Sequence, residues 1–193
     1  GNPDEMLFRQ SLDALNYMMR DQHLPHDVRL RVRDYFRRQK EFQKRKGYVE
    51  LIEASLSRRL QGELHFLISK SVFNSVWWLE QCDSDFLRTL ATHTEREAFA
   101  AEERIPNVDE SGEVRMCVLE VGIASRGGAI LTSGMWWGDL LISAPMLRDM
   151  RVAKALSYCE VVTLTRTSLD ECLHQFPDST KLIREASIKL ATQ

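Results

Sequence analysis

The chain has 193 residues, 44% of them apolar, which is enough for one large domain or two small ones. Its formal net charge of −2 gives no whole-chain argument for a nucleic-acid or membrane-surface partner. No run reaches the roughly 18 apolar residues of a membrane span, and we expect no signal peptide. Four cysteines without a CxxC pair indicate reduced thiols in a cytosolic protein, not a zinc site or disulfides: Cys82, Cys117, Cys159 and Cys172.

The first eighty residues are predicted to be helical. Apolar residues recur on one helical face from Phe8 to Met19, and Leu24-Pro25 then ends this helix and opens the next. Gly47 ends a strongly basic run, and from Tyr48 the apolar spacing stays helical as far as Leu67. Ser57 is a candidate N-cap that would divide that stretch into two shorter helices.

The apolar faces of these helices are too wide to be buried within eighty residues. We therefore expect some of them to pack against a neighbouring subunit. The basic run leaves three interpretations open: a solvated face, ion pairs with another subunit, or a nucleic-acid or anionic-lipid surface. The last is disfavoured because no aromatic residues alternate with the charges. The basic residues are Arg29, Arg31, Arg33, Arg37, Arg38, Lys40, Lys44, Arg45 and Lys46.

The second part of the chain changes to β-type spacing. Asp83 and Ser84 are candidate caps of a helix that ends near Thr94. About eight short strands are then expected, beginning with 98–100, 104–105 and 115–121, and the longest strand-like stretch is 153–165. Ser168 is a candidate cap for the next helix, Pro177 is expected to stop that helix, and an amphipathic helix closes the chain. The predicted fold class is α+β.

Several motifs in this order resemble one known architecture. They are Leu24-Pro25 with Arg29 and Asp34-Tyr35-Phe36, Leu56-Ser57-Arg58-Arg59-Leu60 through Leu64, Val72-Phe73, Leu119-Glu120-Val121-Gly122, Ser133-Gly134-Met135-Trp136-Trp137-Gly138-Asp139, Ala155 to Val161, and Phe176-Pro177. Together they resemble the C-linker and cyclic-nucleotide-binding homology domain of the cyclic-nucleotide-gated, hyperpolarisation-activated and ether-à-go-go cation channels. The resemblance covers nearly the whole chain.

The resemblance implies a helical C-linker at residues 1–80 and a jelly-roll-like antiparallel β-roll with flanking helices at 81–193. It implies that the C-linker forms a homotetramer below an upstream transmembrane pore, at the cytosolic face of a membrane. The channel would conduct potassium or be non-selective among cations. Neither enzyme activity nor a nucleic-acid partner is expected, and the two nearby histidines, His23 and His26, are interpreted as surface residues and not metal ligands.

The resemblance also implies a candidate nucleotide pocket. Its residues would be Trp137, Gly138, Asp139, Leu140, Leu141, Arg148, Arg151 and Ala153. Gly138 would offer backbone N–H groups to a cyclic phosphate and Asp139 would bind the ribose hydroxyl, although aspartate is shorter than the usual glutamate.

The phosphate-binding arginine can be aligned in three ways. An ungapped count places Asp149 at this position, a two-residue deletion places Arg151 there, and Arg148 is the third candidate. Because Asp149 would repel phosphate and Pro145 lacks a donor, we favour a degenerate pocket with no cofactor. The alternative is a functional cAMP or cGMP sensor, in a channel of this kind or in a soluble cyclic-nucleotide-regulated protein. A third possibility is an interaction module that uses exposed tryptophans.

Overall fold

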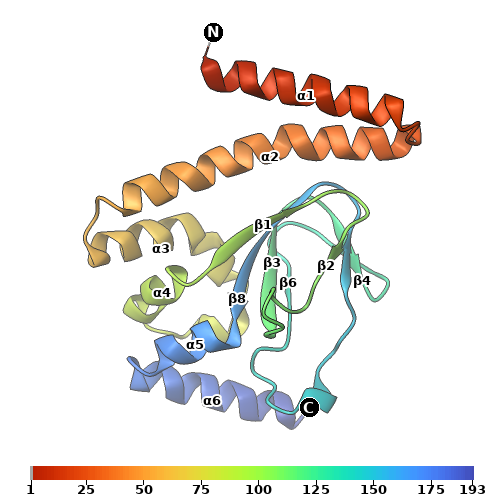
Figure 1. The fold of residues 1–193 in the computed structure, drawn as a ribbon. Helices are drawn as coiled ribbons and strands as arrows, with labels where there is room; N and C mark the ends of the chain where they lie inside the picture. Colours follow the sequence, from red (N-terminus) through yellow and green to blue (C-terminus); the bar gives the residue numbers. More distant parts are fainter. Residues whose placement is uncertain (1) are drawn as a thin grey trace.

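A computed structural model describes residues 2–193 and confirms the predicted α+β fold, with a helical part followed by a β-roll (Figure 1). The helices are α1 (Pro3–Asp21), α2 (His26–Glu53), α3 (Arg58–Asn74), α4 (Ser84–Ala91), α5 (Arg166–Leu173) and α6 (Pro177–Ala191), with short 3₁₀ helices η1 (Trp77–Leu79) and η2 (Pro145–Leu147). The strands are β1 (Glu95–Phe99), β2 (Arg104–Ile105), β3 (Arg115–Val121), β4 (Ala124–Arg126), β5 (Ala129–Leu131), β6 (Trp136–Trp137), β7 (Ala153–Ala155) and β8 (Cys159–Thr165).

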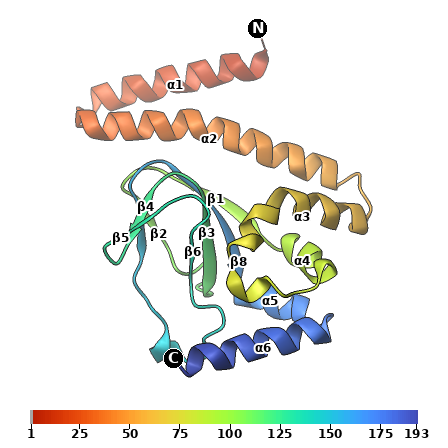
Figure 2. The same ribbon diagram turned by 180° about the vertical axis from the view of Figure 1, so that it is seen from behind.

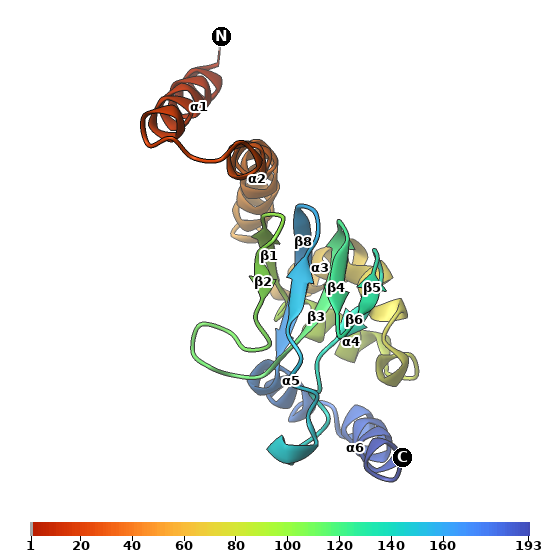
Figure 3. The same ribbon diagram turned by 90° about the vertical axis from the view of Figure 1, so that its right-hand side faces the viewer.

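Helices α1 and α2 form a hairpin that projects from the rest of the molecule. The Phe8 and Phe36 rings stack across it with centroids 5.2 Å apart, and the Lys40 ammonium lies 4.4 Å from the Phe8 centroid. Pro25 precedes α2 with an extended backbone, as its restricted φ favours. Helix α2 lies between α1 and the roll, so α1 is the element farthest from the roll (Figure 3).

The boundary between α2 and α3 follows the predicted cap. Helix α2 continues through Gly47 to Glu53, and the chain then turns. The Ser57 side chain accepts a hydrogen bond from the Leu60 N–H at 3.3 Å, which satisfies one of the free donors of the first turn of α3. The predicted role of Ser57 is confirmed.

The roll consists of two four-stranded antiparallel sheets with strand orders β1-β8-β3-β6 and β2-β7-β4-β5. Alternation along β3 sends Cys117 and Leu119 into the interior between the sheets, whereas Met116 and Val118 face the helices. Helices α3 to α6 cover that outer face (Figure 2). The core between the roll and the helices also contains Val76 and Leu79. It therefore includes residues from both sides of position 80, where the first predicted domain ends.

Three details of the predicted elements are wrong. Helix α5 begins at Arg166, because the Thr165 hydroxyl, at the extended end of β8, caps it by accepting from the Ser168 N–H at 3.2 Å. Pro177 opens α6 instead of stopping α5, a position where its missing N–H costs nothing. The stretch 153–165 is divided into β7 and β8, with the turn at Leu156–Tyr158 between them.

The four cysteines are free and buried. Trp77 is 41% exposed, whereas Trp78 and Trp137 are buried. Within residues 2–193, none of the helices combines the length and apolarity needed to cross a bilayer.

Candidate functional site

The segment after β6 follows the roll closely because of Gly138. Its φ is +112°, and a Cβ at this position would lie 2.5 Å from the Arg115 carbonyl oxygen and 2.8 Å from the Met116 Cα. Both obstacles are backbone atoms of β3, which cannot move aside without disturbing the sheet. Only glycine fits here without strain.

The predicted apolar pocket residues are divided between two cores. Trp137 and Ala153 belong to the interior of the roll, where Trp137 pairs with Cys117 across β3 and β6. Leu140 and Leu141 instead belong to the core between the roll and the helices. The structure therefore does not bring these four residues together in one cavity. The indole Nε1 of Trp137 is buried and has no hydrogen-bond partner among the described residues.

The polar residues predicted for the pocket are engaged within the chain. The Asp139 Oδ2 accepts a hydrogen bond from the Asp149 N–H at 2.6 Å. The Arg148 guanidinium donates to the carbonyl oxygens of Ile142 at 2.9 Å and Ser143 at 3.4 Å. Arg148 thus fastens the loop that precedes it.

Arg151 forms an ion pair with Asp149, two residues earlier. Its Nε and terminal nitrogen lie 2.5–3.0 Å from the Asp149 carboxylate oxygens. These hydrogen bonds and the backbone N–H of Arg151 hold the pKa of Asp149 well below its ordinary value, so the carboxylate stays charged. Asp149 and Arg151, which are alternative candidates for the phosphate-binding position in the sequence, therefore contact each other in the structure.

Arg126 was missed by the sequence analysis, although it belongs to the same group. From the end of β4, its guanidinium donates to the carbonyl oxygens of Arg151 and Asp149, both at 3.0 Å, and lies 3.5 Å from the Asp149 carboxylate. Its only sequence signal is its place before the turn Gly127-Gly128.

No protein-family model matches this chain, and no curated protein does. The family resemblance therefore depends on the motifs and their order alone.

A second region of interest is the contact between α2 and the roll. Residues at helical spacings of three and four present one face of α2 to β8. The Arg45 guanidinium lies 2.5 Å from the Glu160 carboxylate, Arg38 lies 4.4 Å above the Tyr158 ring, and the Tyr35 and Tyr158 centroids are 6.0 Å apart. Part of the basic run thus binds the chain's own roll, an outcome that none of the three sequence interpretations included.

The Glu160 carboxylate is the most buried charge in this contact. The residue is 7% exposed, and the Tyr158 hydroxyl donates a second hydrogen bond to it at 3.3 Å. Arg45 remains 64% exposed, so the ion pair has one buried and one solvated partner. Glu160 was not predicted as a site residue, because an acid within a strand gives no sign of the partner it faces.

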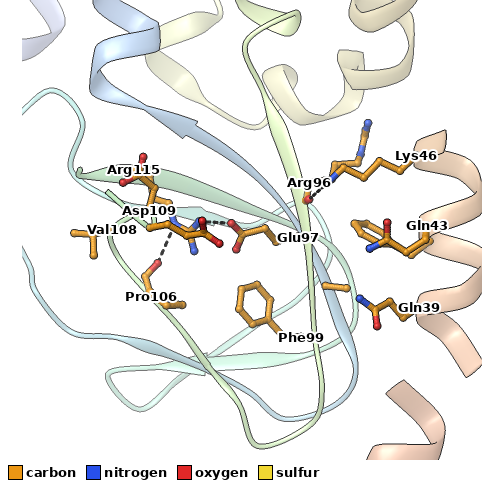
Figure 4. Close-up of a pocket in the computed structure, with 13 residues that line it drawn as sticks. Gln39, Gln43, Lys46, Arg96, Glu97, Phe99, Pro106, Val108, Asp109 and Arg115 are labelled. Atoms are coloured by element: carbon orange, nitrogen blue, oxygen red, sulfur yellow. Dashed lines mark hydrogen bonds and ion pairs between the residues drawn. The ribbon is translucent and has the colours of Figure 1, made fainter. Parts of the chain in front are cut away.

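Open grooves flank this contact. One groove of about 460 Å³ lies between α2, β1 and the loop before β3 (Figure 4), and a second of about 770 Å³ lies toward α3. Phe42, Lys46 and Arg96 line both grooves. Near its middle, α2 therefore contacts β1 at Phe42, between the two grooves.

The first groove contains a buried arginine. Arg115 is 3% exposed, and its guanidinium donates to the Glu97 carboxylate at 2.7 Å and to the Pro106 carbonyl at 3.0 Å (Figure 4). Burial disfavours its charge, but these bonds and nearby acids raise the pKa above its ordinary value, so Arg115 is charged and satisfied.

The second groove contains a histidine–carboxylate contact between α3 and α2. The His65 Nε2 lies against the Glu53 carboxylate, and both side chains are largely buried. Burial lowers the pKa of His65, Glu53 opposes this effect, and Arg96 adds to it. Among residues 2–193, no three histidine, cysteine or acidic side chains gather in a way that could hold a metal ion.

Proposed function

We propose that the chain is the C-terminal gating region of a tetrameric cation channel of the cyclic-nucleotide-gated, hyperpolarisation-activated and ether-à-go-go type. Residues 1–80 would be the C-linker that joins copies of the chain below an upstream pore, and residues 81–193 the β-roll at the cytosolic face of the membrane. The observation that carries the proposal is a β-roll with these motifs in order, preceded by an arm of three helices (α1 to α3) in which α3 packs against the helices of the roll and α2 makes only a narrow contact with the roll.

The exposed surface of the arm supports assembly with further copies. Large apolar side chains remain in solvent on all three of its helices, including Tyr17 at 73%, Leu51 at 69% and Leu67 at 69% exposed. Large apolar side chains exposed on three successive helices favour contact with another copy of the chain. The arm is therefore suited to contact neighbouring C-linkers.

The contact between α2 and the roll supports a coupling role. Between the two grooves, α2 is fixed to the roll by a few side chains, including Arg38, Phe42 and Arg45. A narrow contact can break or pivot at a smaller cost than an extended packed interface. A change in the roll would bias the pore by favouring one arrangement of α2 over another.

The pocket residues support a gating region that works without ordinary nucleotide binding. Asp139 is engaged by the Asp149 N–H, and Arg148 and Arg151 are engaged by backbone and carboxylate groups of the same loop. Titration calorimetry of this chain with cyclic AMP and cyclic GMP should therefore give no binding, or dissociation constants in the millimolar range. A micromolar constant would favour the alternative of a functional nucleotide sensor.

The full-length protein provides the test of the channel assignment. We expect hydrophobic spans upstream of this chain and a cation current when the full-length protein is expressed in a heterologous cell. The variant Arg45→Gln should shift the voltage or rate of opening, whereas the variant Asp85→Asn, which breaks an exposed pair with Arg88 on α4 outside the arm, should not. A full-length protein without any membrane span would refute the assignment.

A further inference from the structure

The segment Asp149 to Arg151 contains an anion and a cation that pair with each other, and β4 supplies a second cation. Arg151 reaches the Asp149 carboxylate with Nε at 2.9 and 3.0 Å and with a terminal nitrogen at 2.5 Å, and the Arg151 N–H donates to Asp149 Oδ1 at 3.0 Å. Arg126 adds a second guanidinium 3.5 Å from the same carboxylate. One carboxylate thus faces two arginines from different parts of the chain.

The backbone around this carboxylate is fixed on both sides. Arg126 donates to the carbonyl oxygens of Asp149 and Arg151, and the Asn107 amide donates to those of Met150 at 3.0 Å and Arg151 at 3.2 Å. The Asp149 N–H is in turn held by Asp139. Asp149 is therefore positioned by several independent contacts and not by the ion pair alone.

The place of the Arg151 guanidinium depends on a glycine. The guanidinium lies directly over Gly127, whose φ is +57°. A Cβ at Gly127 would lie 2.2 Å from a terminal nitrogen of Arg151. The turn after β4 therefore leaves room for a planar cation. Arg126 and Gly127 are adjacent, so the β4–β5 turn supplies both the second cation and the space for the first.

We propose that Arg126 and Arg151 form an anion site that the chain itself fills with the Asp149 carboxylate. A carboxylate that accepts several guanidinium N–H bonds uses the donors with which arginines bind a phosphoryl group. Asp149 thus acts as an internal substitute for phosphate and excludes phosphate ligands. The anion site follows from the geometry alone; only its interpretation as part of a nucleotide pocket rests on the proposed function.

Electrostatics explain why a phosphate would not simply displace Asp149. The Arg151 side chain is 62% exposed, so solvent weakens the ion pair and its contribution to stability is small. An arriving phosphate, however, would be placed beside a fixed carboxylate that stays ionised because its pKa is held low. Repulsion between the two anions, and not the strength of the ion pair, closes the site.

Removal of one charge tests this inference. The variant Asp149→Asn keeps the size of the side chain and the backbone contacts, including those of Arg126, while it removes the charge that faces the Arg151 guanidinium and one terminal nitrogen of Arg126. Titration calorimetry of the variant with cyclic AMP, cyclic GMP and inorganic phosphate, as separate ligands, should give affinity at least tenfold higher than in the original chain for one or more of them. Binding of all three indicates a general phosphate site, and preference for a nucleotide indicates a pocket that also contacts the base or ribose.

Two controls identify the source of any gain. Adding Arg151→Gln to Asp149→Asn should abolish the binding. The variant Asp170→Asn removes the partner of Arg166, a comparable ion pair on α5, and should produce no binding. If Asp149→Asn is unfolded by circular dichroism, Asp149→Ser replaces it.

A folded Asp149 variant that binds none of the three ligands would overturn the inference, as would a double variant that still binds. Gain of binding in Asp149→Asn supports the anion site even if the full-length protein proves not to be a channel. Micromolar binding by the unmodified chain would contradict both the degenerate pocket and the blocking role of Asp149.

Discussion

At the scale of single residues, two glycines of this chain have opposite structural roles. Gly138 holds a φ of +112° against the backbone of β3, where a Cβ would meet the Arg115 carbonyl. Gly47 lies inside helix α2, with nothing within 4 Å of the place where its Cβ would be. The first is required by its surroundings, and the second only makes a helix weaker.

The variants Gly138→Ala and Gly47→Ala should therefore change stability in opposite directions. We expect Gly138→Ala to lower the free energy of unfolding by about 1–3 kcal/mol through backbone strain. Gly47→Ala should raise it by about 0.5–1 kcal/mol through helix propensity. Urea denaturation followed by circular dichroism measures both. Equal stability of the two variants would argue against the strained turn after β6.

The candidate site illustrates why single residues are difficult to interpret from sequence. Arg151 and Asp149 are alternative alignments of one position in sequence, yet in space they are the two partners of an ion pair. Arg126 lies twenty-five positions from Arg151 in the sequence, yet its guanidinium contacts both Asp149 and the Arg151 carbonyl. No motif in the sequence indicates this role.

At the scale of elements, the docking of α2 on the roll includes one partly buried ion pair between Arg45 and Glu160. Glu160 is buried on β8, and Arg45 from α2 and the Tyr158 hydroxyl are its polar partners among the described residues. Loss of Arg45 leaves a buried carboxylate with one hydrogen bond, which is costly, although the exposure of Arg45 reduces the effect.

The variant Arg45→Gln should destabilise the chain by about 1–2 kcal/mol, measured by thermal or urea denaturation. Combining it with Glu160→Gln should recover part of this loss, because the stranded charge is then removed as well. As the matched control, Arg59→Gln breaks the exposed pair with Glu63 and should cost no more than about 0.5 kcal/mol. Additive effects of Arg45→Gln and Glu160→Gln would show that the two side chains are not coupled.

At the scale of the whole molecule, the junction of α2 and α3 should make stability depend on pH. Burial holds the pKa of His65 below its ordinary value, against the attraction of Glu53. The unfolded chain then binds more protons than the folded chain in the window just below pH ~6.5, the unperturbed pKa of histidine. The free energy of unfolding must therefore fall as the pH decreases through this window.

This dependence can be measured by urea denaturation between about pH 7.5 and pH 5. The variant His65→Gln should show a flatter dependence than the original chain. The variant His26→Gln, which replaces an exposed histidine by the same residue, provides the control for the substitution itself. A slope that is the same in all three proteins would mean that His65 does not titrate differently in the folded state.

Much of the architecture could be predicted from the sequence. Helical spacing and the Ser57 cap located α3, and the change of apolar period identified the roll, because local propensity and periodicity specify elements directly. The extent of α2 through Gly47 and the cap at Thr165 were less accessible. A single glycine does not end a helix that tertiary packing supports, and any of three nearby hydroxyl residues, Thr165, Thr167 and Ser168, could have capped α5.

The sequence by itself determined the order of the elements and the α+β class, since each depends on residues close together in the chain. Tertiary structure alone decided which charges meet. Asp149 faces Arg126 and Arg151, and Arg45 reaches Glu160, because the fold places one side chain opposite another across strands and helices. Ion-pair partners depend on distance in space, and periodicity along a sequence carries no information about that distance.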